Sequence, residues 1–158
     1  MEIRTDDLTG QAIQNLLQVH LDAMHAFSPP ESVHALDLAA LRHPSITFWT
    51  AWEGDALLGC GALKQLEPGH GELKSMRTAS GHLRQGVARS MLRHIESAAW
   101  DKGIQRISLE TGSHAPFAAA QKLYASEGFV SCGPFADYAL DPYSTFMTKL
   151  LSKESPLR

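Results

Sequence analysis

The sequence predicts an α/β (α+β) fold in which a mixed, mostly antiparallel central sheet is covered by helices. Three observations support this prediction. Apolar residues recur at helical spacing near the start of the chain. Segments rich in β-branched and aromatic residues then follow one another as an antiparallel meander. Finally, a strand, an amphipathic helix and another strand come in succession over residues 71–110, which requires a crossover between parallel neighbours.

The length of 158 residues suits one domain, expected over residues 1–151 with a frayed tail at 152–158. Net charge is −3 and lysines and arginines form no run, so neither nucleic acid nor an anionic membrane is expected as a partner. The start has no signal-peptide layout and no apolar run approaches membrane-spanning length, which predicts a cytoplasmic protein. Cys60 and Cys132 are expected to be reduced thiols.

The N-terminal part reads as a short strand followed by two helices. Residues 1–4 are expected to form the strand, and apolar residues mark one helical face over residues 11–27. Thr9 is the expected N-cap of this helix. Ser28-Pro29-Pro30 should end the helix, because proline lacks a backbone donor and restricts the residue before it. A short second helix is predicted for residues 33–41.

The middle of the chain reads as three strands. Residues 46–52 and 57–63 form a hairpin through Glu53-Gly54-Asp55, and residues 71–78 follow as the third strand. The period of two places four side chains of this strand on one face: Glu72, Lys74, Met76 and Thr78. The remaining predicted elements are a helix from Val87 to Lys102-Gly103, a strand at 104–110, a helix at 116–126, and strands at 129–132 and 145–151.

The turn before the long helix is a candidate anion site. Gly86 permits close approach of the backbone to a ligand. The first N–H groups of the helix that begins at Val87 have no partner within it, and its dipole is positive there. With Arg84 and Arg89, and Arg93 completing a local basic patch, these groups suit a phosphate or pyrophosphate. The alternative is an ordinary helix start with arginines in water.

Two short segments carry a resemblance to a known family. Leu83-Arg84-Gln85-Gly86-Val87-Ala88 matches a motif of Arg or Gln, two residues, Gly, one residue, and Gly or Ala. LYASEGF, residues 123–129, resembles a Leu-Tyr then Gly-Phe segment. Together with the order of elements, these segments resemble the GCN5-related N-acetyltransferase (GNAT) superfamily over nearly the whole chain. The resemblance implies an enzyme that moves an acetyl group from acetyl-CoA to a primary amine, with a sheet splayed at the cofactor site.

The resemblance also implies a set of cofactor-binding residues: Met76, Thr78, Leu83, Arg84, Gln85, Gly86, Val87, Ala88, Arg89, Phe117, Ala120 and Tyr124. Two positions depart from the family pattern. Leu83 stands where Arg or Gln is usual, so the backbone N–H groups are expected to hold the pyrophosphate. Phe117 stands where many members have an asparagine, so apolar packing is expected to replace that contact with the pantetheine arm.

Catalytic roles follow from the same resemblance. The backbone N–H of Met76 or Thr78 would polarise the thioester carbonyl. Glu72 is expected to act as the general base, through a water molecule, and Tyr124 as the general acid for the leaving sulfur. The alternatives are a strand glutamate paired with Lys74 and a tyrosine that only packs in the core. A catalytically weak CoA-binding sensor or structural protein, and a binding module without CoA, remain alternative functions.

The acceptor is expected to be a small-molecule or peptide amine. The residues expected to line its pocket are His20, His25, Asp137 and Tyr138. No metal is expected, since the eight histidines are scattered without ligand spacing. Because dimers are common in the resembled family, a homodimer that pairs through an exposed last strand is also expected.

Overall fold

The computed structural model describes residues 1–27, 38–83, 85–113 and 115–152. The strands are β1 (Glu2–Thr5), β2 (Ile46–Glu53), β3 (Ala56–Glu67), β4 (His70–Thr78), β5 (Arg106–Gly112), β6 (Val130–Cys132) and β7 (Ser144–Leu150). The helices are α1 (Gln11–Phe27), α2 (Leu38–Leu41), α3 (Val87–Asp101) and α4 (Ala118–Ser126), with short 3₁₀ turns at η2 (Ser80–His82) and η3 (Ala115–Phe117). Within these residues no helix is long and apolar enough to cross a membrane.

The strands form one seven-stranded sheet in the order β1-β2-β3-β4-β5-β7-β6. Strands β4 and β5, which α3 connects, pair in parallel, and the other neighbours pair antiparallel. The predicted mixed sheet, with its early meander and later crossover, is confirmed. The expectation of an exposed last strand is wrong, because β7 inserts between β5 and β6 and has a partner on both sides.

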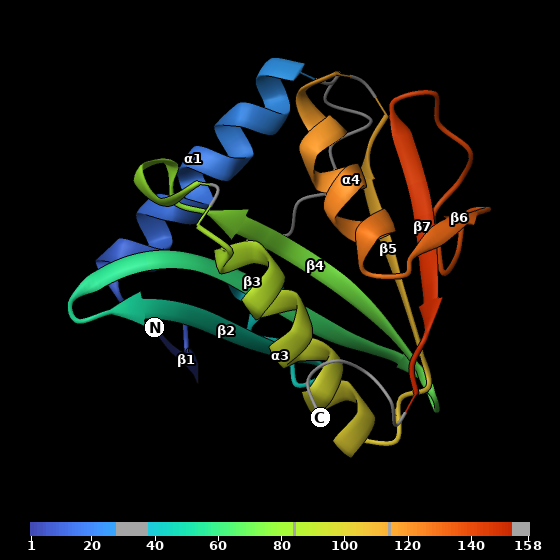
Figure 1. Cartoon of the computed structure of the whole chain (residues 1–158), viewed down its shortest axis with the longest axis horizontal. Coiled ribbons are helices and arrows are strands. Elements are labelled where there is room, and N and C mark those ends of the chain that lie inside the picture. The colour runs from blue at the N-terminus through green and yellow to red at the C-terminus, as the bar shows by residue number, and fades with distance from the viewer. Residues whose placement is uncertain (28–37, 84, 114, 153–158) are drawn as a thin grey trace.

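Helices cover both faces of the sheet. One face packs against α3 (olive in Figure 1) and α4, where Met91, Ile95 and Tyr124 join the larger core cluster. The other face packs against α1 and α2, where Ile13 and Leu41 join a second, separate cluster. Burying each aliphatic side chain of this kind contributes about 1.5–3 kcal/mol. We call these two sides the α3 face and the α1 face.

The bounds of α1 match the prediction, and α4 begins at Ala118 rather than at residue 116, after the η3 turn. However, Thr9 is not the N-cap of α1. The carbonyl of Gly10 accepts the first helical hydrogen bond, from the Gln14 N–H at 3.3 Å. The Thr9 hydroxyl instead donates to the Asp7 carboxylate at 2.7 Å, and the Thr9 N–H does so at 3.1 Å. This local turn satisfies Thr9 before the helix begins. Of the predicted 33–41 helix, only Leu38–Leu41 lies in the described residues.

Candidate active site

Strands β4 and β5 separate from each other at the centre of the sheet. Their pairing runs from His70 opposite Arg106 to Leu73 opposite Leu109, although β4 continues to Thr78 and β5 to Gly112. Figure 1 shows the two strands diverging toward their carboxyl ends. The expected splay is therefore present. Along residues 74–78, the described strands leave the β5 side of β4 unpaired, so backbone groups there are available to a ligand.

A bulge in β4 lies at this splay. Ser75 has φ of +56°, the register with β3 shifts between Cys60 and Ala62, and the Ser75 carbonyl accepts from the Cys60 thiol at 3.2 Å. An extra residue of this kind reverses the side-chain alternation beyond it. The sulfur of Met76 accordingly lies at Gly61 beside Met91, on the α3 face.

The bulge corrects one sequence prediction. Lys74 pairs with Ala62, which belongs to the α1-face cluster, whereas Thr78 pairs with Gly59, whose α-carbon faces Val87 of α3. The expectation that one face carries all four alternating side chains is therefore wrong. Glu72 and Lys74 lie on the α1 face, and the two residues expected to contact the cofactor lie on the α3 face. The strand thus presents different chemistry to its two sides.

Glu72, Lys74 and Tyr138 form a compact polar cluster on the α1 face. The Glu72 carboxylate, 3% exposed, accepts hydrogen bonds from the Tyr138 hydroxyl at 2.5 Å and the Lys74 Nζ at 3.0 Å. Lys74 also donates to the Tyr138 oxygen at 3.1 Å. Burial, and secondarily the Glu72 charge, raise the pKa of Tyr138, so its hydroxyl stays protonated and donates. The Glu72–Lys74 pair, given above as an alternative to the base, is present.

Tyr138 reaches this cluster from the loop between β6 and β7. Its ring packs edge-on against Phe135 at a centroid distance of 5.1 Å and tilts against Phe146 at 5.6 Å. This aromatic support fixes the hydroxyl beside Glu72, and the acceptor-lining role of Tyr138 stays a prediction. The neighbouring Asp137 is exposed. His20 and His25 belong to α1, but their side chains lie outside the described residues.

Glu110 is a further carboxylate that the sequence reasoning did not select. It follows Leu109, the last β5 residue that pairs with β4, and it is half-buried. The Ser144 hydroxyl donates to it at 2.6 Å, and its charge contributes to raising the pKa of Tyr138. The sequence did offer a signal for this residue, namely a glutamate at the end of a strand that separates from its parallel neighbour.

The Gly86 turn has the geometry that an anion site needs. Gly86 has φ of +79° and precedes α3 without a side-chain cap, and its carbonyl accepts from the Ser90 N–H at 3.0 Å. A Cβ built at Gly86 would meet no atom within 4 Å, so the space beside the helix start is open. Gln85 and Leu83 are exposed beside it. Arg84 lies outside the described residues.

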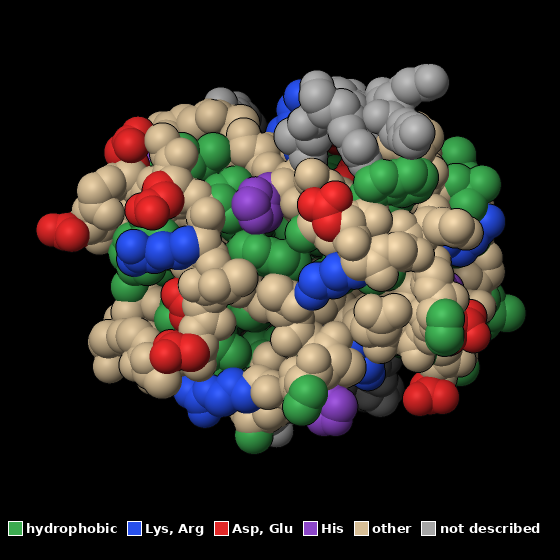
Figure 2. Space-filling view, turned by 90° about the horizontal axis from the view of Figure 1, so that it is seen from below, with side chains coloured by type: hydrophobic (Ala, Val, Ile, Leu, Met, Phe, Trp, Pro, Cys, Tyr) green, Lys and Arg blue, Asp and Glu red, His purple; other side chains and the backbone are tan. Residues whose placement is uncertain are grey.

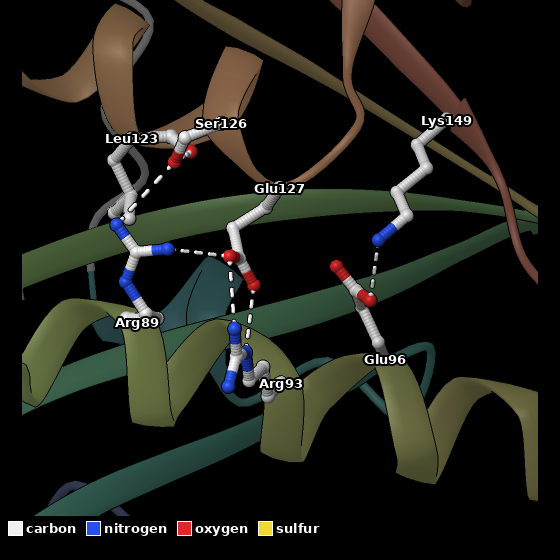
Figure 3. A network of polar contacts seen from close by, with 7 residues as sticks. All are labelled: Arg89, Arg93, Glu96, Leu123, Ser126, Glu127 and Lys149. Carbon is white, nitrogen blue, oxygen red and sulfur yellow. Dashed lines mark hydrogen bonds and ion pairs between the residues drawn. The ribbon is translucent and has the colours of Figure 1, made fainter. Parts of the chain in front are cut away.

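Arg89 and Arg93 bind a carboxylate of the protein itself (Figure 3). Glu127, at the end of α4, accepts from Arg89 Nη1 at 2.6 Å and from Arg93 Nε at 2.8 Å. Its side chain is 5% exposed, and the hydrogen bond from Arg93 is the main cause of its lowered pKa. The charge of these two arginines is therefore paired within the protein, and it ties α3 to α4. That Arg89 contacts the cofactor stays a prediction.

A second ion pair joins α3 to the sheet (Figure 3). Lys149 Nζ of β7 donates to Glu96 Oε1 at 2.8 Å, with Glu96 2% exposed. Glu96 Oε2 is buried and has no hydrogen-bond partner within the described residues. Burial is the main cause that raises the Glu96 pKa. The two ion-pair groups hold α3, α4 and β7 in one arrangement.

Tyr124 lies in the core of the α3 face, and Phe117 lies at the carboxyl end of β5. Tyr124 is 6% exposed and packs edge-on against Phe129 at 5.7 Å. Burial raises its pKa well above the usual range, so the hydroxyl remains a proton donor at neutral pH. The Phe117 ring covers the backbone of Gly112 so closely that a Cβ there would overlap it. Ala120 packs against the same core cluster.

On the face that Figure 2 shows, acidic and basic side chains are interspersed over the visible surface. In the described part of the chain, no group of three or more His, Cys, Asp and Glu side chains is placed to hold a metal ion.

Comparisons with known proteins agree with this geometry. The model of the acetyltransferase (GNAT) family matches residues 13–129. YsnE of Bacillus subtilis (strain 168), an uncharacterized N-acetyltransferase, is 59% identical over 96% of this chain and 100% of its own. A Klebsiella pneumoniae structure, provisionally described as an acyl-CoA N-acyltransferase, has a TM-score of 0.77 at 27% identity, covering 96% of this chain and 97% of that one.

One solved structure adds a bound molecule to the comparison. A GNAT family acetyltransferase from Elizabethkingia anophelis, with acetyl-CoA bound, shares the fold at a TM-score of 0.70 and 16% identity, covering 95% of this chain and 97% of that one. The resemblance that the sequence motifs suggested is thus confirmed by the family model, by a near-full-length relative and by the fold. This chain belongs to the GNAT acetyltransferase family and is an acyltransferase enzyme.

Proposed function

We propose that the protein transfers the acetyl group of acetyl-CoA directly to a primary amine of a small molecule or peptide. One observation carries the proposal: the β4–β5 splay lies between an open helix start at Gly86 and the Glu72–Tyr138 cluster on the opposite face. An anionic cofactor and an amine can therefore meet at the splay from opposite sides. The acetyl-CoA found in the Elizabethkingia relative supports this choice of donor.

The residues on the α3 face suit acetyl-CoA, which supplies an activated acetyl thioester. Backbone N–H groups at the start of α3, which no side chain caps, would hold the pyrophosphate. The exposed Leu83 offers no hydrogen bond to it, and Arg89 is engaged by Glu127, so these N–H groups carry the binding. Phe117 provides an apolar wall for the pantetheine arm in place of an amide.

Glu72 would act as the general base. A lysine-like amine of pKa near 10.4 pays about 4.6 kcal/mol to be neutral at pH 7, at 1.36 kcal/mol per pKa unit. Glu72 takes the proton through a water molecule, while Tyr138 and Lys74 hold its carboxylate in one orientation. Both partners therefore act as positioning residues for Glu72. Glu110, on the other strand of the splay, is the competing carboxylate.

The thioester would be activated from the splayed strand. The backbone N–H of Met76 or Thr78 donates to the carbonyl oxygen where negative charge develops. Tyr124, protonated because burial raises its pKa, donates to the departing sulfur. A thiol has a pKa of about 8.5 and leaves readily without assistance, so loss of Tyr124 should slow turnover rather than abolish it.

Two measurements test the proposal. Acetyl-CoA at 100 times its Kd should add about 2.7 kcal/mol of stability, measured as a rise in Tm. Thiol release over a panel of amines should then detect turnover, which Glu72→Gln should lower by at least about 100-fold if general base catalysis contributes its usual share. Glu110→Gln is the matched variant. A larger effect of Glu110→Gln would transfer the role to Glu110, and no Tm shift at millimolar acetyl-CoA would refute the function.

A second candidate function rests on the Glu72–Lys74 contact. If this ion pair keeps the carboxylate from accepting a proton, the protein is a catalytically weak CoA-binding sensor of the same fold. Binding of acetyl-CoA without thiol release for any amine is the outcome that favours this candidate. Restored turnover in Lys74→Met would then identify the ion pair as the block.

A further inference from the structure

Arg77 places a positive charge on the α1 face next to the Glu72 cluster. It pairs across the sheet with Cys60, which packs in the α1-face cluster with Ile13 and Phe48. Side chains directly opposite each other on neighbouring strands share a face. Arg77 therefore lies on the side of β4 where the proposed acceptor enters, beyond the bulge at Ser75.

The Arg77 side chain is unusual among the arginines that the structure describes. Its Nε is buried and has no hydrogen-bond partner within the described residues. By contrast, Arg93 binds Glu127, Arg106 binds the Thr148 hydroxyl, and Arg42 binds the Leu8 carbonyl. Buried N–H donors in folded proteins nearly always have a partner, and an exception calls for a ligand or water. Residue 77 as a whole remains partly exposed, although its Nε is covered.

The other cation on this face of β4 does not serve the same purpose. Lys74 is neutralised by the Glu72 carboxylate at 3.0 Å. On the α1 face of β4, the Glu72–Lys74 ion pair is thus followed by Arg77, whose Nε lacks a hydrogen-bond partner within the described residues. A guanidinium presents parallel donors that match the two oxygens of a carboxylate.

We infer that Arg77 binds a carboxylate of the acceptor, so that the substrate class is small amino carboxylates; this inference rests on the proposed function. Arg77 lies beyond Leu73, the last β4 residue that pairs with β5. Because of the Ser75 bulge, these two residues pair with Cys60 and Leu63, which are three residues apart on β3, roughly 10 Å at about 3.3 Å per residue. The arginine side chain spans part of that length. An acceptor of a few carbons then spans the rest, with its amine at the splay near Glu72 and its carboxylate at Arg77.

Matched substrate pairs test the inference. Thiol release is measured with glycine, β-alanine and 4-aminobutyrate, each against its own carboxamide, which keeps the amine and removes the charge. The natural protein should favour at least one carboxylate over its amide by about tenfold or more in kcat/KM, as expected for a charge-assisted bidentate contact. Arg77→Gln should remove that preference, chiefly through KM, and Arg77→Lys should restore part of it. Arg4→Gln, at an exposed arginine of β1, is the control and should keep the preference.

The outcomes separate this inference from the proposed function. Turnover of amines with no preference for any carboxylate, or a preference that survives Arg77→Gln, overturns the inference and leaves the acetyl transfer standing. An absence of both acetyl-CoA binding and turnover refutes the two together. Thiol release is also measured with 2-aminoethanesulfonate, to show whether the anion must be a carboxylate. A higher kcat/KM for the sulfonate than for the carboxylates would overturn the assignment of a carboxylate. Because Arg77→Gln removes a buried donor without a partner, its Tm should be no lower than that of the natural protein, which keeps the variant usable.

Discussion

Gly86→Ala offers the sharpest test of where the cofactor binds. At φ of +79°, an alanine strains the backbone by about 1–2 kcal/mol, and its reduced freedom in the unfolded chain offsets roughly 0.4–1 kcal/mol of this. The open space around an added Cβ means that no clash within the protein adds to the strain. The net loss of stability should be about 1 kcal/mol, or about 2–4 °C in Tm for a domain of this size.

The effect on acetyl-CoA should be larger than the effect on stability. A methyl group at the helix start occupies space that the pyrophosphate would use and displaces it from the backbone N–H groups. Loss of hydrogen bonds to a charged group costs about 1.5–3 kcal/mol, which corresponds to roughly a 10–150-fold rise in Kd. Arg89→Gln should raise Kd less, because Glu127 already engages that guanidinium.

Gly103→Ala is the matched control for this experiment. Gly103 follows the other end of α3, has φ of +81°, and likewise has no atom within 4 Å of an added Cβ. Both variants should therefore lose similar stability, while only Gly86→Ala loses affinity in isothermal titration calorimetry with acetyl-CoA. Equal Kd values for the two variants, or a greater loss in Arg89→Gln, would refute a backbone anion site at Gly86.

Three further predictions concern the ion pairs and thiols. Lys149→Met should destabilise the protein by about 3–5 kcal/mol in urea unfolding, because it leaves Glu96 buried and unpaired, and adding Glu96→Gln to this variant should recover much of the loss. Since the Glu96 pKa is already raised above 4.5, the stability loss of the single variant should shrink as the pH falls toward that pKa. A stability loss that does not depend on pH would contradict this account. Glu127→Gln should cost about 1–2 kcal/mol at pH 7 from its lost charged hydrogen bonds. Because the Glu127 pKa is lowered, this contribution is present above pH 4.5 and disappears as the pH falls through the folded pKa, so a constant difference in Tm down to low pH would count against it. Burial raises the pKa of Cys60 to about 12, so Cys60 should resist a thiol reagent in the native state, whereas the half-buried Cys132 should react first. Mass spectrometry of the labelled protein checks this order, and labelling of Cys60 before Cys132 would contradict it.

Local signals explain why so much of the fold was predictable. The apolar periodicity of residues 11–27 and the prolines after it give α1 its observed bounds. Gly54 and Gly103 have the positive φ that their turns require, and both positions were read as chain reversals or helix ends. In each case the determining residues lie within a few positions of the feature.

The features that sequence reasoning missed depend on distant contacts. Tyr138 meets Glu72 across 66 residues, and no local pattern connects them. Glu127 was a helix-terminal residue in the sequence, and only the packing of α4 on α3 brings it to Arg89. The bulge occurs at Ser75, which has none of the glycine signal that accompanies most positive φ angles. The insertion of β7 between β5 and β6 likewise depends on pairing over the whole sheet.

The Ser75 bulge has a consequence for how the acceptor preference of such an enzyme could change. Because the alternation reverses there, positions 72, 74 and 77 face one side of β4 while positions 73, 76 and 78 face the other. A library that randomises positions 74 and 77, with the proposed base Glu72 kept, would therefore vary the acceptor chemistry and leave the cofactor side and the larger core intact. Randomising the second three should mainly reduce folding and CoA affinity. One strand thus separates the residues that can diversify from those that must stay fixed.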